Sequence, residues 1–411
     1  MTDALIIDAC RTPRGIGKPG KGALSHLHPQ HLGATVLKAI AERNHLDTAE
    51  VDDVIWGTGT QVDKQGTNLG RMSALDAGYD AASSGVTLDR FCAAGLTAVS
   101  LACASIMSGM EDLIVAGGTE MMSYVSTLPP IGSVFLDRGN EHLRALHPQS
   151  HQGVCADAIA ALEGIGRTDV DALALESQRR AAHAIRSGHF RRSLVAVYNA
   201  DGSLALDKDE HPRPQTTAEG LASLKPAFAD IADTVLDEHN TTYRKLIHRK
   251  YPGLNIPHIH HAGNSSGVVD GAAAVLVASP AYAKKRGLKP RARIVAYANM
   301  GDSPTLMLNA PVPAVKKLLQ KVGLTVNDID LWEVNEAFAV VAEKFVRDLK
   351  LDRNKVNVNG GAIALGHPIG ATGAVLVGTM LDELERLQLK RGLITMCAGG
   401  GMAPAIIVER I

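Results

Sequence analysis

The chain has 411 residues, a length that predicts two to three domains. Hydrophobic residues make up 45% and charged residues 21%, which argues against disordered, collagen-like and disulfide-scaffold proteins. Because 42 Lys and Arg residues are balanced by 43 Asp and Glu residues, the basic excess of a nucleic-acid-binding protein is absent, and we expect no nucleic-acid partner.

The first part of the chain alternates predicted helices and strands. A helix over residues 31–44 leads to a strand around 51–61, and GVTLDRF (85–91) predicts a strand that runs into Cys92. The apolar segment CAAGLTAVSLACASIMSGM (92–110) predicts a helix, and DLIVAGGTEMMS predicts the next strand. This helix is long enough for a membrane span, but its Thr and Ser residues favour burial inside an α/β core, so we expect no membrane partner.

Residues 124–254 have a different composition, richer in charge, Pro and His. They contain a predicted amphipathic helix near residues 169–187, a short strand in LVAVYN, and the run DEHPRPQTTAEGLASLKPAF. Long irregular segments in compact domains usually form lids or binding loops. We therefore interpret this stretch as an insertion that covers a site.

The last part of the chain repeats the order of the first. A helix in PAVKKLLQKVG (313–323) leads to IDLWEVNEAF (329–338), and KVNVNGG (355–361) predicts a strand. A buried helix in AVLVGTMLDELERL (374–387) and strand segments in GLITMCAGGGMAPAIIVER (392–410) follow. Because strand, reactive residue, buried helix, strand and glycines recur in the same order, we interpret the chain as a duplicated α/β unit.

The cysteines do not indicate a disulfide framework or a zinc site, because none are paired at CxxC spacing. They are Cys10, Cys92, Cys103, Cys155 and Cys397. The N-terminal stretch MTDALIIDACRTPRG lacks the basic region and long apolar run of a signal peptide, and the C-terminal VERI is not a peroxisomal signal. We therefore predict a reducing, cytoplasmic location.

Two residues at starts of the buried helices are candidates for chemistry. Cys92 is predicted in the first turn of its helix, where free N–H groups and the helix dipole would lower the pKa of a thiol, so it is a candidate nucleophile. The alternative is a buried structural cysteine. His367, in the turn GHPIG, is suited as a neutral ring to accept a proton or to donate to a thioester oxygen, the alternative being a turn residue without a chemical role.

Two more candidates follow predicted strands. Cys397 precedes the glycines at 399–401, which allow backbone N–H groups to approach a substrate closely, the alternative being a tight connection between strands. Asn335, in VNEAF, has the simple alternative of capping the following helix. A duplicated unit would bring these junctions together in one site.

The histidines at 258, 260 and 261 suggest a metal site, but no carboxylate or cysteine lies beside them at ligand spacing. We therefore predict no metal.

These motifs together resemble the thiolases, or acetyl-CoA acetyltransferases, over essentially the whole chain. The matching segments are RTPRG, FCAAGLTAV, AGGTEMMS, DEHPRPQTT, LKPAF, AGNSSGVVDGAAA, VNEAF, NGGAIALGHPIGATG and CAGGGM. The resemblance implies an α/β protein with a five-layered αβαβα fold of two duplicated halves and an inserted loop domain. It also implies a homodimer or homotetramer.

The resemblance further implies three regions. The N-terminal half would comprise residues 1–123 with about 255–277, and the C-terminal half residues 278–411. The loop domain, residues 124–254, would cover the active site and bind CoA.

The resemblance assigns roles to the four candidates. Cys92 is similar to the nucleophile that becomes acylated, His367 to the base that activates it, and Cys397 to the acid/base at the substrate α-carbon. Asn335 is similar to the residue holding a water that forms one oxyanion hole with His367. The backbone N–H groups of Cys92 and Gly399 would form the other.

Three further residues are similar to substrate-binding positions. Ser266 matches a residue near the pantetheine arm of CoA, and Arg213 a basic residue near the adenosine phosphate. Gln152, in an HQG segment where the family has HMG, would form the wall beside the acyl group. Two residues depart from the family pattern: Gln152 stands in place of methionine, and Ala94 stands where many thiolases have serine. The change at Gln152 leaves the acyl-chain preference open.

The implied activity is acyl-CoA C-acyl transfer, as in β-oxidation: 3-oxoacyl-CoA is cleaved with CoA, or two acetyl-CoA molecules condense, through an acyl-cysteine. Acyl-CoA and CoA are the implied partners, and no cofactor is implied because two cysteines and a histidine meet the chemical needs. One alternative is a β-ketoacyl synthase-like condensing enzyme, which would generally lack Cys397. The other is a catalytically silent CoA-binding member of the fold, against which all four side chains argue.

Overall fold

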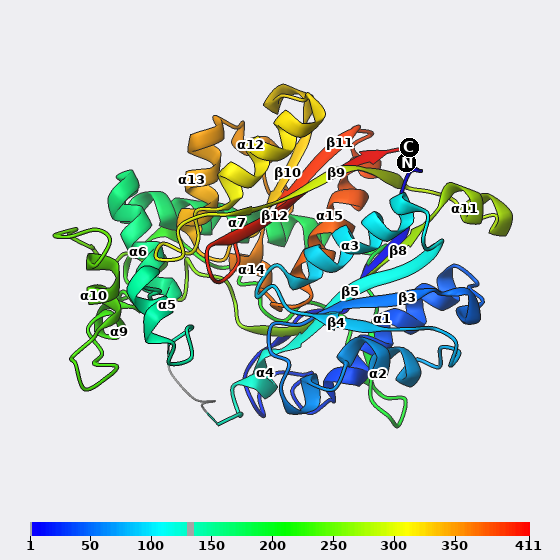
Figure 1. Ribbon diagram of the computed structural model, residues 1–411, viewed down its shortest axis with the longest axis horizontal. Coiled ribbons are helices and arrows are strands. Elements are labelled where there is room, and N and C mark those ends of the chain that lie inside the picture. Colours follow the sequence, from blue (N-terminus) through cyan, green and yellow to red (C-terminus); the bar gives the residue numbers. More distant parts are fainter. Residues whose placement is uncertain (1, 130–134) are drawn as a thin grey trace.

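The computed structural model describes residues 2–129 and 135–411, and strands from both halves of the chain form its centre (Figure 1). The first half contributes β1 (Leu5–Arg11), β2 (Gly15–Ile16), β3 (Asp53–Gly57), β4 (Val86–Leu88), β5 (Leu113–Met121) and β8 (Val269–Ala278). The second half contributes β9 (Ala292–Gly301), β10 (Leu331–Val334), β11 (Arg391–Thr395) and β12 (Met402–Arg410).

The strand order shows the internal repeat. The first half-sheet runs β4-β3-β5-β8-β1 and the second runs β10-β11-β12-β9, with β3 parallel to β5 and β10 parallel to β11. A short antiparallel pairing of β1 with β9 joins the two half-sheets through hydrogen bonds. The strand expected in KVNVNGG was wrong, because only Val356 pairs, in a single parallel bridge to Trp332. That bridge occupies the place that β4 has in the first half.

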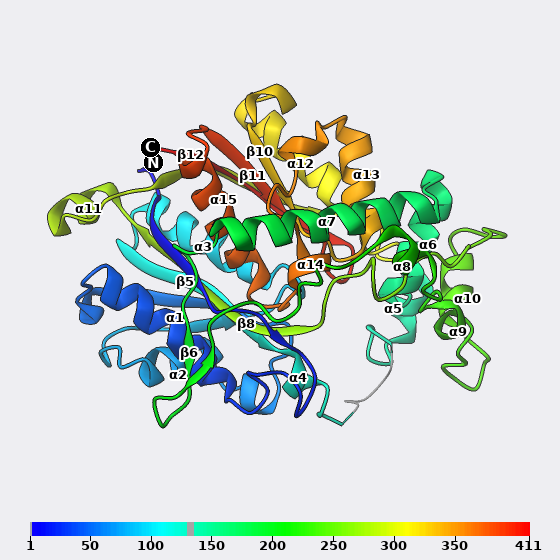
Figure 2. The ribbon, with the colours of Figure 1, turned by 180° about the vertical axis from the view of Figure 1, so that it is seen from behind.

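Helices and half-sheets alternate in five layers (Figures 1 and 2). The outer helices are α1 (Pro29–Arg43) and α2 (Leu69–Asp76) on the first half-sheet, and α12 (Pro311–Val322) and α13 (Ala339–Leu349) on the second. The middle layer contains α3 (Ala94–Ser108) and α15 (Thr372–Arg386). Along β8, Val275 and Val277 pack toward the middle layer while Ala274 and Leu276 pack toward the outer helices, as the alternation of a strand dictates.

Within the described residues, the segment Phe91–Ser108 is the one helical stretch with the length and apolarity of a membrane span. Most of α3 is buried between the half-sheets and against α15. The two helices approach so closely that a Cβ at Gly373 would lie 2.0 Å from the backbone nitrogen of Leu96. Glycine is therefore required at this crossing, and α3 packs as a core helix.

Most helices of the long insertion gather at one end of the molecule, whereas its longest helix extends from there to the centre and its hairpin lies beside α1 and α2 (Figure 2). After α4 (Met122–Val125) the helices of the insertion are α5 (Glu141–Leu146), α6 (Gln152–Glu163), α7 (Arg167–Ser187), α8 (Ala218–Ala222), α9 (Ala229–Ala232) and α10 (Tyr243–His248), with a hairpin of β6 (Val197–Tyr198) and β7 (Leu204–Leu206). Helix α7 packs against α13 and the short α14 (Ala362–Leu365), and α6 packs against α13. The remaining helix, α11 (Pro280–Arg286), follows β8.

Candidate active site

Parallel strands of both half-sheets end at the candidate site. Cys92 comes shortly after β4, Asn335 directly after β10, and Cys397 shortly after β11. The backbone N–H of Asn335 donates to the carbonyl of Thr395 at the end of β11, so these two strand ends lie side by side. Ligands in α/β proteins bind outside the carboxyl ends of such strands, because loops and helix starts converge there.

The loop that carries His367 closes the gap between the two halves. It lies against the first turn of α3, where a Cβ at Gly95 would be 2.5 Å from the carbonyl oxygen of Gly370. His367 Nε2 lies 3.5 Å from Asn335 Nδ2. His367 and Asn335 of the second half therefore meet each other, and the loop that carries His367 contacts the helix turn that follows Cys92.

Hydrogen bonds fix the tautomer of His367. The Thr372 hydroxyl donates to the carbonyl of Pro368 at 2.9 Å, so it accepts from His367 Nδ1–H, at 2.6 Å. Nδ1 therefore carries the proton and Nε2 carries the lone pair. Burial, with a smaller contribution from the positive charge of Arg14, lowers the pKa of His367 to about 3. The ring is neutral at pH 7, the state predicted from the sequence, and its Nε2 can accept a proton.

The electrostatic environment of Cys92 corrects one expectation. Helix α3 begins only at Ala94, and Ala93 occupies its N-cap position. Burial, followed by the negative charge of Glu120, raises the pKa of Cys92 to about 12, although its own backbone N–H and that of Gly399 act in the opposite direction. The predicted lowering of this pKa was therefore wrong: loss of solvation outweighs the helix terminus. Cys92 is a neutral thiol that needs a base.

The glycine run after Cys397 forms a tight connection between strands, and it also brings backbone close to Cys92. Ala398 and Met402 form an antiparallel bridge around it, and Gly400 has φ +74°. A Cβ at Gly399 would lie 2.9 Å from the ring of Phe91, so only glycine brings this N–H to the Cys92 sulfur. Burial, with a smaller effect of Cys92, raises the pKa of the Cys397 thiol. Both thiols are therefore protonated at rest.

Asn335 does not cap a helix. The N-cap of α13 is Phe338, so the capping interpretation was wrong. Asn335 is only 1% exposed, and its Oδ1 has no hydrogen-bond partner among the residues that the structure describes. A buried amide oxygen without a partner is costly, which fits a site that binds a polar group or a water.

A cavity of about 270 Å³ adjoins Cys92. Its lining combines apolar side chains and backbone with polar side chains of α6, of α10 and of the loop before α6. Its lining comprises Gly59, Phe91, Cys92, Leu136, Gln149, Ser150, His151, Gln152, Tyr243, Met307, Ile369 and Gly399. Gln152 thus lies on the wall of this cavity, at the first position of α6.

The two residues predicted to contact CoA lie outside this cavity. Arg213 is exposed and lines a separate cavity of about 250 Å³ with Gln178, His211 and Gly263. Ser266 is partly buried, and its backbone N–H donates to the carbonyl of Ala337, within the VNEAF segment.

The histidine cluster forms a hydrogen-bonded network instead of a set of free ligands. His258 Nδ1 and His260 Nδ1 each lie 2.7 Å from an oxygen of the buried Asp157, and His261 Nε2 lies 2.8 Å from Asp171. The carboxylates come from α6 and α7, far away in sequence. In the described part of the chain, no group of three His, Cys, Asp or Glu side chains is arranged to hold a metal ion.

Two residues that the sequence analysis did not single out support the site. Thr372 orients His367, as described above. Glu120 accepts hydrogen bonds from the backbone N–H groups of Gly59 and Gly370 at 2.7 and 3.0 Å, and so joins loops of the two halves beside Cys92. Burial raises the pKa of Glu120. The position of Thr372 at the start of the helix after His367 could have indicated its role, but nothing local to Glu120 does so.

Two thiols, a neutral histidine and an asparagine at the strand ends of a duplicated α/β unit are groups that an acyltransferase with a cysteine nucleophile would use. The chain belongs to the thiolase family. Residues 4–236 match the family "Thiolase, N-terminal domain" and residues 288–410 match "Thiolase, C-terminal domain".

Relatives with established names support the same family. A steroid 3-ketoacyl-CoA thiolase of Mycobacterium tuberculosis is 40% identical over 419 residues, covering 100% of this chain and 95% of the relative. A beta-ketoadipyl-CoA thiolase of Acinetobacter baylyi is 39% identical, with 100% of both chains covered. The crystal structure of the Bacillus anthracis acetyl-CoA acetyltransferase superposes with a TM-score of 0.85 at 34% identity, over 100% of this chain and 99% of that chain. The protein is a thiolase and therefore an acyltransferase with the thiolase-like α/β fold.

Proposed function

We propose that this thiolase cleaves 3-oxoacyl-CoA with CoA to give acetyl-CoA and a shortened acyl-CoA, or catalyses the reverse condensation, through an acyl group on Cys92. The observation that carries this proposal is that the backbone N–H groups of Cys92 and Gly399 both approach the Cys92 sulfur beside the cavity. Cys397 lies near enough to this sulfur for the two thiols to interact electrostatically. The neutral His367 supplies the base that a thiol of raised pKa requires.

The first half-reaction breaks a carbon–carbon bond. His367 Nε2 takes the proton of Cys92, and the sulfur attacks C3 of the substrate, whose developing oxyanion accepts hydrogen bonds from the N–H groups of Cys92 and Gly399. The C2–C3 bond then breaks, and its electron pair forms the enolate of acetyl-CoA. Protonated His367 and a water held by Asn335 stabilise the enolate oxygen, and Cys397 gives its proton to the α-carbon.

The second half-reaction moves only a thioester. A new CoA thiol gives its proton to the Cys397 thiolate and attacks the acyl group on Cys92. The N–H groups of Cys92 and Gly399 hold the oxyanion again, and the Cys92 sulfur leaves and recovers its proton from His367. Every proton is returned, so the protein's own groups suffice for the cycle and CoA takes part as a substrate.

In this proposal, the two cavities hold different parts of the substrate. The acyl group occupies the cavity beside Cys92, whose described lining contains no Lys or Arg. The adenosine end of CoA lies near Arg213, with Ser266 beside the pantetheine arm. The absence of a cation among the described lining residues favours uncharged acyl groups over acyl groups that end in a carboxylate, whose desolvation would go uncompensated.

The direct test is an assay of CoA-dependent cleavage with 3-oxoacyl-CoA esters of increasing chain length and one with a terminal carboxylate. We expect cleavage of uncharged esters, and intact-mass and peptide analysis should find the acyl group on Cys92. No cleavage with any ester, or acylation at Cys397 instead, would overturn the proposal.

We also propose that the protein forms a homodimer or homotetramer through β4. This strand is at the outer end of its half-sheet, and Val86 on β4 and Leu101 on α3 are each 43% exposed. An unpaired edge strand with apolar neighbours favours pairing with a second copy. Light scattering should give two or four times the 43.3 kDa of the chain, and Val86→Asp should reduce that mass. A monomeric wild-type protein would contradict this assembly.

A further inference from the structure

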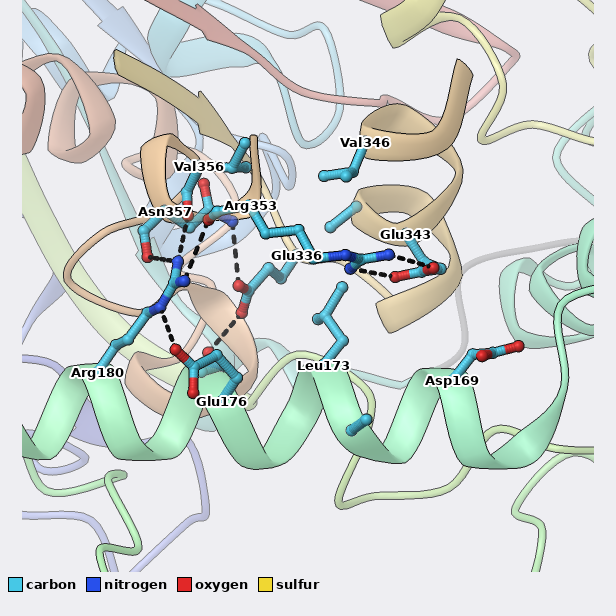
Figure 3. Close-up of a pocket in the computed structure, with 13 residues that line it drawn as sticks. Asp169, Leu173, Glu176, Arg180, Glu336, Glu343, Val346, Arg353, Val356 and Asn357 are labelled. Atoms are coloured by element: carbon cyan, nitrogen blue, oxygen red, sulfur yellow. Dashed lines mark hydrogen bonds and ion pairs between the residues drawn. The ribbon is translucent and has the colours of Figure 1, made fainter. Parts of the chain in front are cut away.

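A cavity on the far side of the VNEAF segment reaches the residue next to Asn335 (Figure 3). It has a volume of about 260 Å³ and lies between α7 and α13. In its wall, Glu176 pairs with Arg180 and Glu343 pairs with Arg353. Glu336 is 3% exposed and belongs to neither ion pair.

Three donors from separate segments converge on Glu336. Its Oε2 accepts from the Ser177 hydroxyl of α7 at 2.7 Å and from the backbone N–H of Ile363 in α14 at 3.2 Å. Its Oε1 accepts from Asn357 Nδ2 at 3.0 Å. Ser177 Oγ in turn accepts from the N–H of Gly361 at 3.0 Å. One carboxylate therefore joins the insertion, the loop after α13 and the segment that leads to His367.

The space for this carboxylate is built into the neighbouring segment. A Cβ at Gly361 would lie 2.2 Å from the carboxyl carbon of Glu336, so any larger residue would displace it. Burial raises the pKa of Glu336, while the three hydrogen bonds favour its ionised form. All three partners act as donors, and an ionised carboxylate is the group that satisfies them together.

Asn357 connects Glu336 to the end of β10. Its Oδ1 accepts from the N–H of Val334 and its Nδ2 donates to the carbonyl of Val334, both at 2.9 Å. The side chain thus pairs with the last residue of β10 as a neighbouring strand would. Because Val334 directly precedes Asn335, Glu336 is linked to the asparagine through Asn357 as well as through the chain.

We propose that Glu336 is a positioning residue that sets the distance between Asn335 and His367, and this inference rests on the proposed function of that pair. Ile363 lies in the single turn α14, and this turn leads directly to Gly366 and then to His367. A carboxylate that holds both Val334, through Asn357, and Ile363 fixes the two sides of the 3.5 Å Asn335–His367 contact. The groups of an oxyanion hole must be held in place accurately, since small displacements sharply reduce the stabilisation of the transition state.

The test is Glu336→Gln, which keeps the size of the side chain. In one orientation of the glutamine amide, its NH₂ group would face the donors Ser177 and Ile363. In the other orientation it would face the donor Asn357, so neither orientation satisfies all three partners. Asn357 cannot turn over without losing both bonds to Val334. We expect kcat for thiolysis to fall at least tenfold while KM for CoA and for the 3-oxoacyl-CoA stays within twofold, because Glu336 lines neither proposed substrate cavity.

Glu343→Gln is the matched control. Glu343 is 2% exposed, lines the same cavity, and accepts from Arg347 and Arg353, and within the described residues it has no hydrogen bond to Asn335 or to the segment that leads to His367. This variant should lose thermal stability but keep kcat within twofold. If Glu336→Gln lowers the melting temperature by a similar amount yet keeps wild-type kcat, the positioning role is overturned while the wild-type activity continues to support the proposed function.

A second variant keeps the inference testable if Glu336→Gln does not fold. Ser177→Ala removes the bridge from Glu336 to Gly361 but leaves the carboxylate and Asn357 in place. We expect kcat to fall about threefold to fivefold with unchanged KM. Wild-type kcat in this variant would contradict the proposal, as would a loss confined to KM.

Discussion

The two halves of the molecule have the same strand order but carry different chemical groups at their strand ends. The first half presents one thiol, Cys92, ahead of α3. The second presents Asn335 after β10, His367 ahead of α15, and Cys397 after β11. The two halves thus supply equivalent frames, and the side chains at equivalent strand ends differ: across the interface between the halves, Cys92 lies near Gly399 and the second thiol, Cys397.

The two thiols also differ in access. Cys92 borders the cavity beside Phe91, whereas Cys397 is 1% exposed and lies behind the glycine turn. Both have raised pKa values, so neither is active as a free thiolate. This difference in access to the cavity agrees with the proposal that Cys92 carries the acyl group and Cys397 transfers a proton.

The largest expected effect comes from the first half. Cys92→Ala removes the nucleophile and should lower thiolysis on the order of 10⁴-fold or more, as loss of a covalent nucleophile does in other enzymes. Cys103→Ala is the control, because Cys103 is buried in α3, the helix that follows Cys92, and does not line the cavity. It should reduce stability and keep activity. Substantial turnover by Cys92→Ala would show that the first half does not supply the nucleophile through Cys92.

The second thiol separates the two half-reactions. Cys397→Ser keeps the shape but is far less acidic, so Cys92 should still accept an acyl group from a simple acyl-CoA. Cleavage and condensation should fall on the order of 10³-fold, and exchange of acetyl-CoA α-protons with deuterated water should stop. Deuterium uptake at the wild-type rate would make Cys397 structural and leave His367 as the next candidate base.

Asn335→Ala should have the next largest effect. Loss of one oxyanion donor costs on the order of 2 to 4 kcal/mol of transition-state stabilisation, and kcat should fall accordingly. Asn359→Ala is a matched control, because Asn359 is a buried amide of the same half whose Oδ1 lies 2.8 Å from His189 Nδ1. It should retain kcat within a few-fold. Equal losses in both variants would show that Asn335 acts through packing alone.

The sequence predicted the repeat and all four candidates because these features are local: a strand, a reactive residue and a glycine-rich turn. The pKa of Cys92 was not predictable in the same way, since loss of solvation around the thiol in the folded chain outweighs the helix terminus. Partners remote in sequence were also missed. His258 binds Asp157 of α6, and Glu336 binds Ser177 of α7, contacts that exist only once the insertion packs on segments that follow it in the chain.

The raised pKa of Cys92 predicts the pH dependence of its alkylation. A thiol with a pKa of about 12 stays protonated through pH 9, so the thiolate fraction grows about tenfold for each pH unit. Inactivation by iodoacetamide, followed as loss of activity with the site mapped by peptide mass, should accelerate from pH 7 to pH 9 without levelling. A plateau above pH 7 would instead indicate a thiolate stabilised by α3 and His367.

The smallest expected effect concerns the cavity wall that the insertion contributes. Gln152 is the first residue of α6, and the helix is capped by His151, so Gln152→Met changes the wall without removing the cap. Methionine favours an apolar chain, so kcat/KM for a long 3-oxoacyl-CoA relative to 3-oxobutyryl-CoA should rise about threefold to tenfold, the effect of a methylene-sized change in a pocket. Gln215→Met, in the cavity of Arg213, is the control and should leave this ratio unchanged. If both variants shift the ratio equally, or neither does, the acyl group does not contact the Gln152 wall, and specificity must arise nearer to Cys92, where Phe91 and Ile369 line the cavity.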